Sequence, residues 1–420
     1  MTVNSHTRPR RPLRSAIDLA VLGILLAVGP AGAADPGLTS DTILLGSHQP
    51  LSGPAATYSL IPRASEAYFK MINEQGGVHG RRIVYKYEDD TYQPPRTVEV
   101  VRKLIERDQV FSIFNGLGTP THTAVYKYIL DRGVPDMYVA TGATKWAFPP
   151  ENGFKPYRGL FGFQPNYLTE GSIFGVFAIQ RWSGKKVAVL YQNDDFGKDG
   201  AEAFRHAIEG KLTVAADDVY EVTAVTIDSQ LLKAKNAGAD VVFLFAIPKF
   251  VGMYLKKAHE IGWKPAFLVS AVSNSPQTWK LAGPDCDPPA GKVQCAPSDG
   301  VFSLQWLPSI DDKDNPKVVR HYEIVEKYGS GLKVDNITIY GQAAAELMVE
   351  TLRRAGRDLT RDSMLKAAES IKGWSDGLIS NVTMGPDDHA PVEDLKVVSI
   401  KNGKIDKDLT DWIQGSRPKK

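Results

Sequence analysis

The sequence predicts an α/β protein with two doubly wound βαβ lobes joined by a three-crossover hinge. Strand-like and helix-like segments alternate along the chain, which is typical of βα domains. A chain of 420 residues is long for one core and suits two domains. The alternation restarts where the chain would pass from one lobe to the other, and repeated crossings form a hinge rather than a loose linker.

The first 34 residues have the three parts of a secretory signal peptide. Arginines precede an apolar run at residues 19–28, and small residues follow at 31–34. The run is short for a retained membrane anchor. The pair Arg10 and Arg11 leaves twin-arginine export open beside the general route. We expect the segment 1–34 to be cleaved and the mature protein to lie in the periplasm.

The charge balance of the remaining chain argues against nucleic acid as a partner. The whole sequence carries a formal charge of +2, but the first 34 residues hold four arginines and one aspartate. The rest contains 46 basic and 47 acidic residues, a net charge of −1. There is no basic field of the kind that binds DNA or RNA.

The segment 42–80 organises the first lobe. It reads as a short apolar strand, a loop and a helix whose apolar residues recur at helical spacing over 61–72. Gly76 and Gly77 end this helix, because glycine adopts the left-handed conformation without a Cβ clash. Ligands of open α/β sheets bind beyond the carboxyl ends of the strands. We therefore expect residues 52–58 to face a small molecule.

The other elements follow the same alternation. We expect strands at residues 82–88, 110–114, 136–140, 186–191, 219–225, 241–245 and 266–270. We expect helices at residues 94–105, 123–131, 168–182, 200–209, 230–236, 250–261 and 338–355. Loops at 115–121 and 141–146 should face the crevice, and a further loop is expected at 193–200. A hairpin at 396–404 should turn at Asn402-Gly403.

The predicted crossings lie near residues 164–167, 301–305 and 374–379. They assign residues 35–163 and 306–374 to an N-terminal lobe. They assign residues 164–305 and 375–420 to a C-terminal lobe.

Two cysteines, Cys286 and Cys295, lie close together in a loop rich in proline and glycine. Outside the cytoplasm such a pair forms a local disulfide that holds the loop. A metal site is the alternative, but it would need further ligands, and the sequence has neither an HExxH pattern nor a second CxxC pair. We expect the disulfide and no metal.

No combination of residues predicts catalysis. The adjacent carboxylates of residues 88–90 would point to opposite faces of a strand. The triplet at 195–197 reads Asp-Phe-Gly, but no glycine-rich phosphate loop accompanies it, and Walker A and GxSxG motifs are absent. His48 lies near the crevice without a nucleophile beside it. We expect no enzyme activity and no cofactor; an amide hydrolase working in a two-lobed cleft is the enzymatic alternative.

Four motifs in order carry a resemblance to a known family: TILLGSHQPLSGPAATYS, INEQGGVHGRRI, YEDDTYQP and VLYQNDDFGKDG. The sequence resembles the branched-chain amino acid binding family of type I periplasmic binding proteins over nearly all of the mature chain. The resemblance implies a monomeric two-lobed clamp that closes on a small solute and presents it to the permease subunits of an ABC importer. A ligand-sensing subunit of a signalling system is the alternative role.

The resemblance also implies a set of ligand-binding residues. Thr119 and a hydroxyl residue near 142–144 match positions that hold a ligand carboxylate, and aromatic side chains match positions around the ligand body. The implied set is Tyr58, Thr119, Ala143, Thr144, Phe196 and Phe245, with Trp146 also expected around the body.

One departure from the family pattern bears on the ligand. Amino-acid binders of this family carry a carboxylate after the strand that corresponds to residues 266–270, where it pairs with the ligand ammonium. This chain reads SAVSNS at residues 270–275, without an acid. An unpaired buried ammonium costs several kcal/mol. We expect an aromatic or other hydrophobic carboxylic acid, and a free amino acid only if Asp194 or Asp195 reaches the ammonium.

Overall fold

The computed structural model describes residues 1–5, 35–283, 286 and 295–415. The chain forms two units, Met1–Ala34 and Asp35–Lys420. Residues 1–5 of the first unit are exposed. The rest of the predicted signal peptide lies outside the described residues, so its cleavage stays a prediction. All elements below belong to the second unit.

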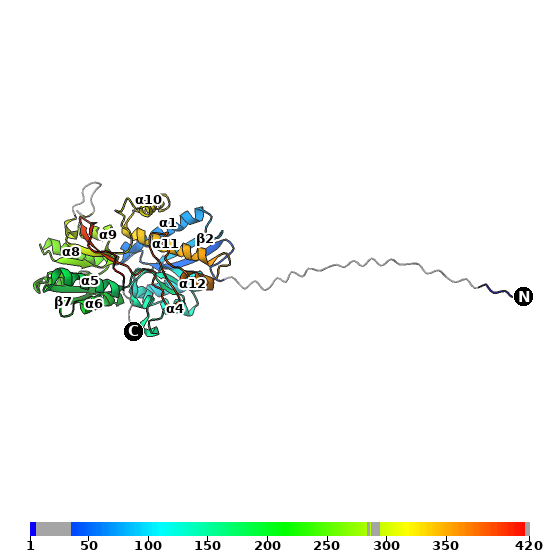
Figure 1. Cartoon of the computed structure of the whole chain (residues 1–420), viewed down its shortest axis with the longest axis horizontal. Helices are drawn as coiled ribbons and strands as arrows, with labels where there is room; N and C mark the ends of the chain where they lie inside the picture. Colours follow the sequence, from blue (N-terminus) through cyan, green and yellow to red (C-terminus); the bar gives the residue numbers. More distant parts are fainter. Residues whose placement is uncertain (6–34, 284–285, 287–294, 416–420) are drawn as a thin grey trace. The chain divides into compact units, whose positions relative to one another are not determined.

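The first sheet is parallel and has the strand order β2-β1-β3-β4-β5. Its strands are β1 (Thr42–Gln49), β2 (Arg82–Asp89), β3 (Ser112–Phe114), β4 (Asp136–Val139) and β5 (Leu160–Gly162). Its helices are α1 (Leu60–Glu74), α2 (Pro94–Arg102), α3 (Thr119–Thr123), α4 (Tyr126–Asp131), α10 (Pro316–Tyr328), α11 (Asn336–Ala355) and α12 (Arg361–Glu369). Figure 1 shows α1, α10, α11 and α12 in the same half of this unit, although they are far apart in sequence. The glycine of α11 permits close packing on α1, since a Cβ at Gly341 would lie 2.2 Å from the Ile61 carbonyl oxygen.

The second sheet has the strand order β12-β11-β10-β9-β8-β6-β7. Its strands are β6 (Lys186–Gln192), β7 (Thr213–Tyr220), β8 (Val241–Phe245), β9 (Ala266–Val269), β10 (Val301–Gln305), β11 (Lys396–Lys401) and β12 (Lys404–Asp408). Its helices are α5 (Tyr167–Trp182), α6 (Asp195–Ile208), α7 (Asp228–Asn236), α8 (Pro248–Glu260) and α9 (Pro276–Lys280). Strands β6 to β10 are parallel, and β11 and β12 form an antiparallel hairpin at the edge. Two doubly wound α/β halves are therefore confirmed.

Short helices complete the connections after the strands. They are η1 (Ala56–Ser59), the π-helical turn η2 (Lys103–Arg107), η3 (Thr144–Trp146), η4 (Pro150–Asn152), η5 (Ala271–Ser273) and η7 (Ala296–Ser298). Several of them carry the loops that follow the carboxyl ends of strands, where the sequence places the ligand crevice.

Most predicted elements match within a few residues, but the segment 193–200 was wrongly expected to be a loop. Helix α6 begins at Asp195, and the side chain of Asp194 accepts a hydrogen bond from the Gly197 amide at its first turn. Gly197 lies against the end of β6, because a Cβ there would be 2.0 Å from the Gln192 carbonyl oxygen. The glycines of this motif serve close packing and not a flexible loop.

Three other expectations need correction. Strand β7 spans Thr213–Tyr220 instead of 219–225, because this edge strand pairs only with β6 and its acidic, half-exposed residues lack a clear apolar pattern. The helix expected at 123–131 is split into α3 and α4. The segment 301–305, expected as a connection, is the inner strand β10.

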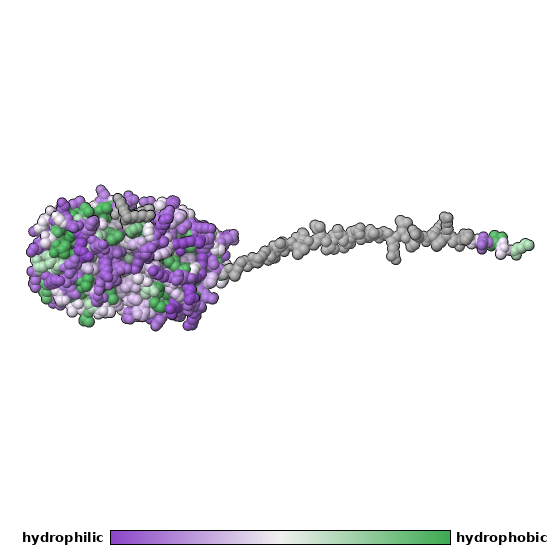
Figure 2. All heavy atoms as spheres, turned by 90° about the horizontal axis from the view of Figure 1, so that it is seen from below, coloured by the Kyte–Doolittle hydropathy of each residue, from purple (hydrophilic) through white to green (hydrophobic). Residues whose placement is uncertain are grey.

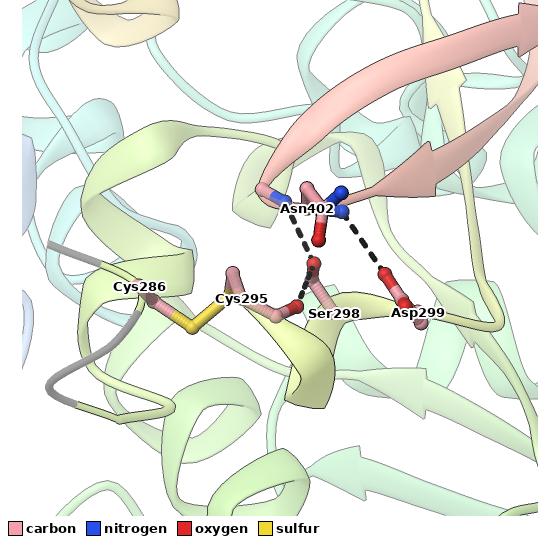
Figure 3. Close-up of a disulfide and its surroundings, with 6 residues drawn as sticks. Cys286, Cys295, Ser298, Asp299 and Asn402 are labelled. Atoms are coloured by element: carbon pink, nitrogen blue, oxygen red, sulfur yellow. Dashed lines mark hydrogen bonds between the residues drawn. A yellow bond between two sulfur atoms is a disulfide. The ribbon is translucent and has the colours of Figure 1, made fainter. Parts of the chain in front are cut away.

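The C-terminal hairpin is confirmed, and a disulfide lies beside its turn. Asn402 and Gly403 have positive φ values of 52° and 72°, which a two-residue type I′ turn requires. Figure 3 shows the Cys286–Cys295 disulfide near this turn. The Gly403 amide donates to the Ser298 hydroxyl, which donates to the Cys295 carbonyl oxygen. The disulfide thus holds the segment on which the hairpin turn rests.

The surface is mostly hydrophilic, with small scattered apolar groups on the face that Figure 2 shows. In the part of the chain that the structure describes, no helix combines the length and the apolar character needed to cross a membrane.

Candidate functional site

A cavity lies between the two halves, at the carboxyl ends of their parallel strands. Most of its lining residues follow β1 to β5 of the first sheet and β6, β8, β9 and β10 of the second, and the others belong to β10, β12 and α11. This is the position at which open α/β sheets bind ligands. Its volume is about 110 Å³. An engineered apolar cavity of about 150 Å³ holds benzene, so the space suits a small molecule.

Most of the cavity wall is aromatic or aliphatic. The aromatic lining residues are Tyr58, Tyr92, Tyr167, Phe196, Trp306 and Tyr340. The larger aliphatic lining residues are Ile61, Leu117, Ile247, Val272, Leu304, Leu307, Ile337 and Ile405. The Tyr58 hydroxyl donates to the Val272 carbonyl oxygen over 3.2 Å, which ties η1 of the first half to η5 of the second.

Hydroxyl and amide side chains form one polar region of the wall. The hydroxyls of Thr119 and Thr141 form a hydrogen bond with each other, and the Thr141 hydroxyl lies 3.4 Å from the Tyr167 hydroxyl. Gln164 lies 3.3 Å from the same tyrosine oxygen and accepts a hydrogen bond from Tyr340. Burial raises the pKa of Tyr167 and Tyr340 above the usual value. These tyrosines therefore stay neutral hydrogen-bonding groups at physiological pH.

No charged side chain is present among the described residues that line the cavity. Two buried carboxyl groups of the second half, Glu170 and Asp194, are outside the lining and are already hydrogen-bonded. Glu170 accepts from the Ser270 hydroxyl and the Ala271 amide, and burial raises its pKa to about 7. Asp194 accepts hydrogen bonds from Gln192 and the Gly197 amide, and burial also raises its pKa.

Asp195 and Asp199 hold the two halves together. The amide of Thr144 donates to Asp199 over 2.9 Å, and burial raises the pKa of Asp199 to about 6. Lys145 forms a 2.6 Å ion pair with Asp195. Both carboxylates belong to α6, whereas Thr144 and Lys145 belong to η3, which follows the first sheet. The contacts therefore connect the halves across the cleft.

The structure brings three of the six predicted site residues to the cavity. Tyr58, Thr119 and Phe196 line it; their role in ligand binding stays a prediction. Ala143 and Thr144 are buried outside the lining, where the Thr144 amide serves Asp199. Of the predicted loop 52–58, only Tyr58 reaches the cavity.

Phe245 and Trp146 lie behind the wall. Phe245 is fully buried, with ring centroids 4.8 Å from Phe196 and 5.5 Å from Tyr167, so it supports two lining rings. Trp146 packs edge-on against His122 and Tyr126 and is 1% exposed.

Sequence reasoning missed three lining tyrosines. Tyr92 is the third residue after β2, which ends at Asp89, and its positive φ of 57° turns the chain beyond the strand. A tyrosine beyond a strand end was the available signal. Tyr167 opens α5 and Tyr340 lies inside α11, and at these positions tyrosine is indistinguishable from a core residue in the sequence.

His48, considered as a base, does not line the cavity; it is fully buried between Asp90 and His122. Among the described residues, no group of histidine, cysteine and carboxylate side chains is arranged to hold a metal ion.

Comparison with known proteins gives consistent matches. A family model described as periplasmic binding protein matches residues 42–404. The Leu/Ile/Val-binding protein homolog 1 of Brucella suis biovar 1 is 23% identical over 353 residues, which are 83% of this chain and 85% of that protein. A fatty acid ABC transporter substrate-binding protein from Thermomonospora curvata has a TM-score of 0.78 and 22% identity, over 91% of this chain and 95% of its own. A branched chain amino acid ABC transporter from Thermus thermophilus with bound valine has a TM-score of 0.78 and 19% identity, over 90% and 98% of the two chains.

Proposed function

Because the chain belongs to the periplasmic binding protein family, among its branched-chain amino acid binding type I members, we propose that it captures a small hydrophobic or aromatic carboxylic acid. It is a solute-binding protein of the ABC transporter type and not an enzyme. In this proposal the two lobes close on the acid in the periplasm, and the closed protein delivers it to the permease subunits of an importer.

The observation that supports this ligand class is the absence of charge from the lining side chains that the structure describes. A free amino acid would bring a buried ammonium without a carboxylate partner. Such an unpaired charge costs several kcal/mol, and about 4 kcal/mol lowers affinity a thousandfold. A carboxylate needs only hydrogen-bond donors, which neutral hydroxyl and amide groups supply. Thr119 and Thr141 are the donors that we assign to its acid end.

Asp194 and Asp195 were the residues through which an ammonium could still be held. Neither lines the cavity; Asp194 caps α6, and Asp195 pairs with Lys145. Because both carboxylates already have partners, this arrangement supports a carboxylic acid as the ligand over a free amino acid.

The comparisons do not decide the solute, because one fold serves different ligands. The neighbours described as a fatty acid transporter protein and as a valine complex have the same TM-score of 0.78 with this chain. The lining of the cavity therefore carries the argument. A branched-chain amino acid is the second candidate, since the Brucella suis relative is named for leucine, isoleucine and valine.

We further propose that the lobes correspond to the two sheets, with the first two crossings at 163/164 and 305/306. Trp306, directly after β10, packs against Phe163 and Tyr340 of the first half. Val392 still packs in the core of the first sheet, whereas Leu395 packs in that of the second. These contacts favour a third crossing near 393–394 instead of 374/375.

Matched ligand pairs test the proposal directly. We would titrate the mature protein, beginning at Asp35, with 4-methylpentanoate and leucine, and with 3-phenylpropanoate and phenylalanine, by isothermal titration calorimetry. Each acid differs from its partner only by the ammonium group. We expect at least one acid to bind much more tightly than its amino acid. Tighter binding of leucine or phenylalanine would contradict the proposal and would support the amino-acid candidate.

A further inference from the structure

Four buried ionisable side chains form a continuous hydrogen-bonded chain behind the cavity wall. His48 Nδ1 lies 2.8 Å from Asp90 Oδ2, and His48 Nε2 lies 2.9 Å from His122 Nδ1. His122 Nε2 lies 2.8 Å from Asp136 Oδ2. All four side chains are fully buried. We define these residues as the Asp90–Asp136 relay.

The geometry of the relay fixes its proton content. Each of its three short contacts needs one proton between the two heavy atoms. Two neutral histidines with two ionised carboxylates supply only two protons, both directed at the carboxylates. The contact between His48 and His122 would then join two nitrogen lone pairs. One additional proton, shared between the rings, satisfies all three contacts, and a further proton on either ring would place two N–H groups against each other.

The surroundings favour this state. Asp90 also accepts hydrogen bonds from the Tyr92 amide and the Thr97 hydroxyl. Burial lowers the pKa of His122 on balance; the carboxylate of Asp136 acts in the opposite direction, and the charge of Lys145 lowers this pKa further. Lys145 itself is paired with Asp195. The lowered pKa of His122 favours its neutral form, with Nδ1 as an acceptor in the contact with His48.

The relay is in direct contact with the cavity wall. The Tyr92 amide donates to Asp90, and the Leu117 amide donates to the His48 carbonyl oxygen over 3.3 Å. Tyr92 and Leu117 both line the cavity. Gly116 lies flat on both rings, because a Cβ there would be 2.7 Å from His48 Nε2 and 2.9 Å from His122 Nδ1. Gly116 therefore places the segment that leads to Leu117 and Thr119 directly against the contact between the two rings.

We propose that the Asp90–Asp136 relay positions the cavity wall while its two histidines share one proton. Ligand binding then depends on pH through this proton. Gain of a second proton or loss of the shared one breaks the contact between the histidines and moves segment 116–119. Ligand affinity then has a maximum at intermediate pH. On each side it falls toward tenfold per pH unit, the limit for one linked proton. The relay affects ligand affinity through the cavity wall, so this part of the inference rests on the proposed function.

The first test uses the free protein and needs no ligand. Nitrogen-15 NMR of the histidine side chains should show one proton shared between His48 Nε2 and His122 Nδ1 at neutral pH. Acidification should remove this signal and shift the amides of Gly116, Leu117 and Thr119 over the same pH range. Two neutral rings without a shared proton, or loop amides that do not follow the rings, would overturn the inference. Either result leaves the proposed ligand class unaffected.

The second test measures affinity. Titrations of the wild-type protein with 4-methylpentanoate, and in parallel with leucine, are made from pH 4 to pH 9. The His48→Gln variant should lose the pH dependence of the dissociation constant, and Asp90→Asn should shift it. His321→Gln is the matched control, since His321 is also fully buried but its ring bonds to the neutral side chains of Thr338 and Gln342. A wild-type dissociation constant that is constant across this range, or one changed equally by His321→Gln, would refute the coupling.

If the variants do not fold, the wild-type NMR titration still decides the matter. Their folding is checked by circular dichroism before any affinity is compared.

Discussion

Replacing Thr119 by valine tests the polar region of the cavity while the shape of the side chain is kept. Thr119 is 2% exposed, lines the cavity and shares a hydrogen bond with Thr141. If its hydroxyl donates to the ligand carboxylate, the lost bond involves a charged partner and is worth about 1.5–3 kcal/mol. The dissociation constant should then rise about tenfold to 150-fold.

Thr123→Val is the matched control for this change. The Thr123 hydroxyl lies one turn further along and donates to the Thr119 carbonyl oxygen, outside the cavity lining. Calorimetric titration with 4-methylpentanoate and with 3-phenylpropanoate compares both variants with the wild type. Urea unfolding checks stability, which Thr119→Val should lower by only about 1 kcal/mol, the typical value of one hydrogen bond. Equal affinity of the two variants would refute the assignment of Thr119 to the acid end.

Two further predictions concern stability. The pKa of Glu170 is raised to about 7 from 4.5, so the folded state binds more protons between these values and its stability falls as pH rises through this window. The loss is on the order of 3 kcal/mol, and Glu170→Gln should reduce the difference in urea midpoint between pH 4.5 and pH 8; an unchanged difference would contradict it. Replacing Cys286 and Cys295 by alanine removes a crosslink across a sequence separation of 9. This should lower stability by about 3 kcal/mol and speed amide exchange at Gly403, whereas an equal midpoint would speak against a stabilising crosslink.

Local sequence patterns predicted an element correctly where burial or turn geometry alone determines its conformation. The buried strand β8 matches its predicted bounds, since a continuous apolar run fits a fully buried parallel strand. The turn at Asn402-Gly403 follows from the conformational preference of these two residues. The edge strand β7 was misplaced because its exposed acidic residues obscure the alternation.

The site was harder to predict because lining a cavity and supporting its wall need the same residue types. Phe196 and Phe245 were expected to play one role, yet Phe196 lines the cavity and Phe245 packs behind it. Thr119 and Thr144 are both buried hydroxyl residues after first-sheet strands, but the amide of Thr144 is bonded to Asp199. These differences depend on tertiary packing, which spacing in the sequence does not encode.

The charge of the cavity wall also depends on tertiary packing. An anion in the cavity is favoured only if the buried carboxyl groups nearby do not repel it. With its pKa raised to about 7, Glu170 holds a proton in about half of the molecules at neutral pH. Its partner Ala271 belongs to the lining, so a ligand carboxylate near that wall would favour the protonated form further. A neutral lining backed by a protonatable carboxyl group therefore accommodates an acid without a basic side chain.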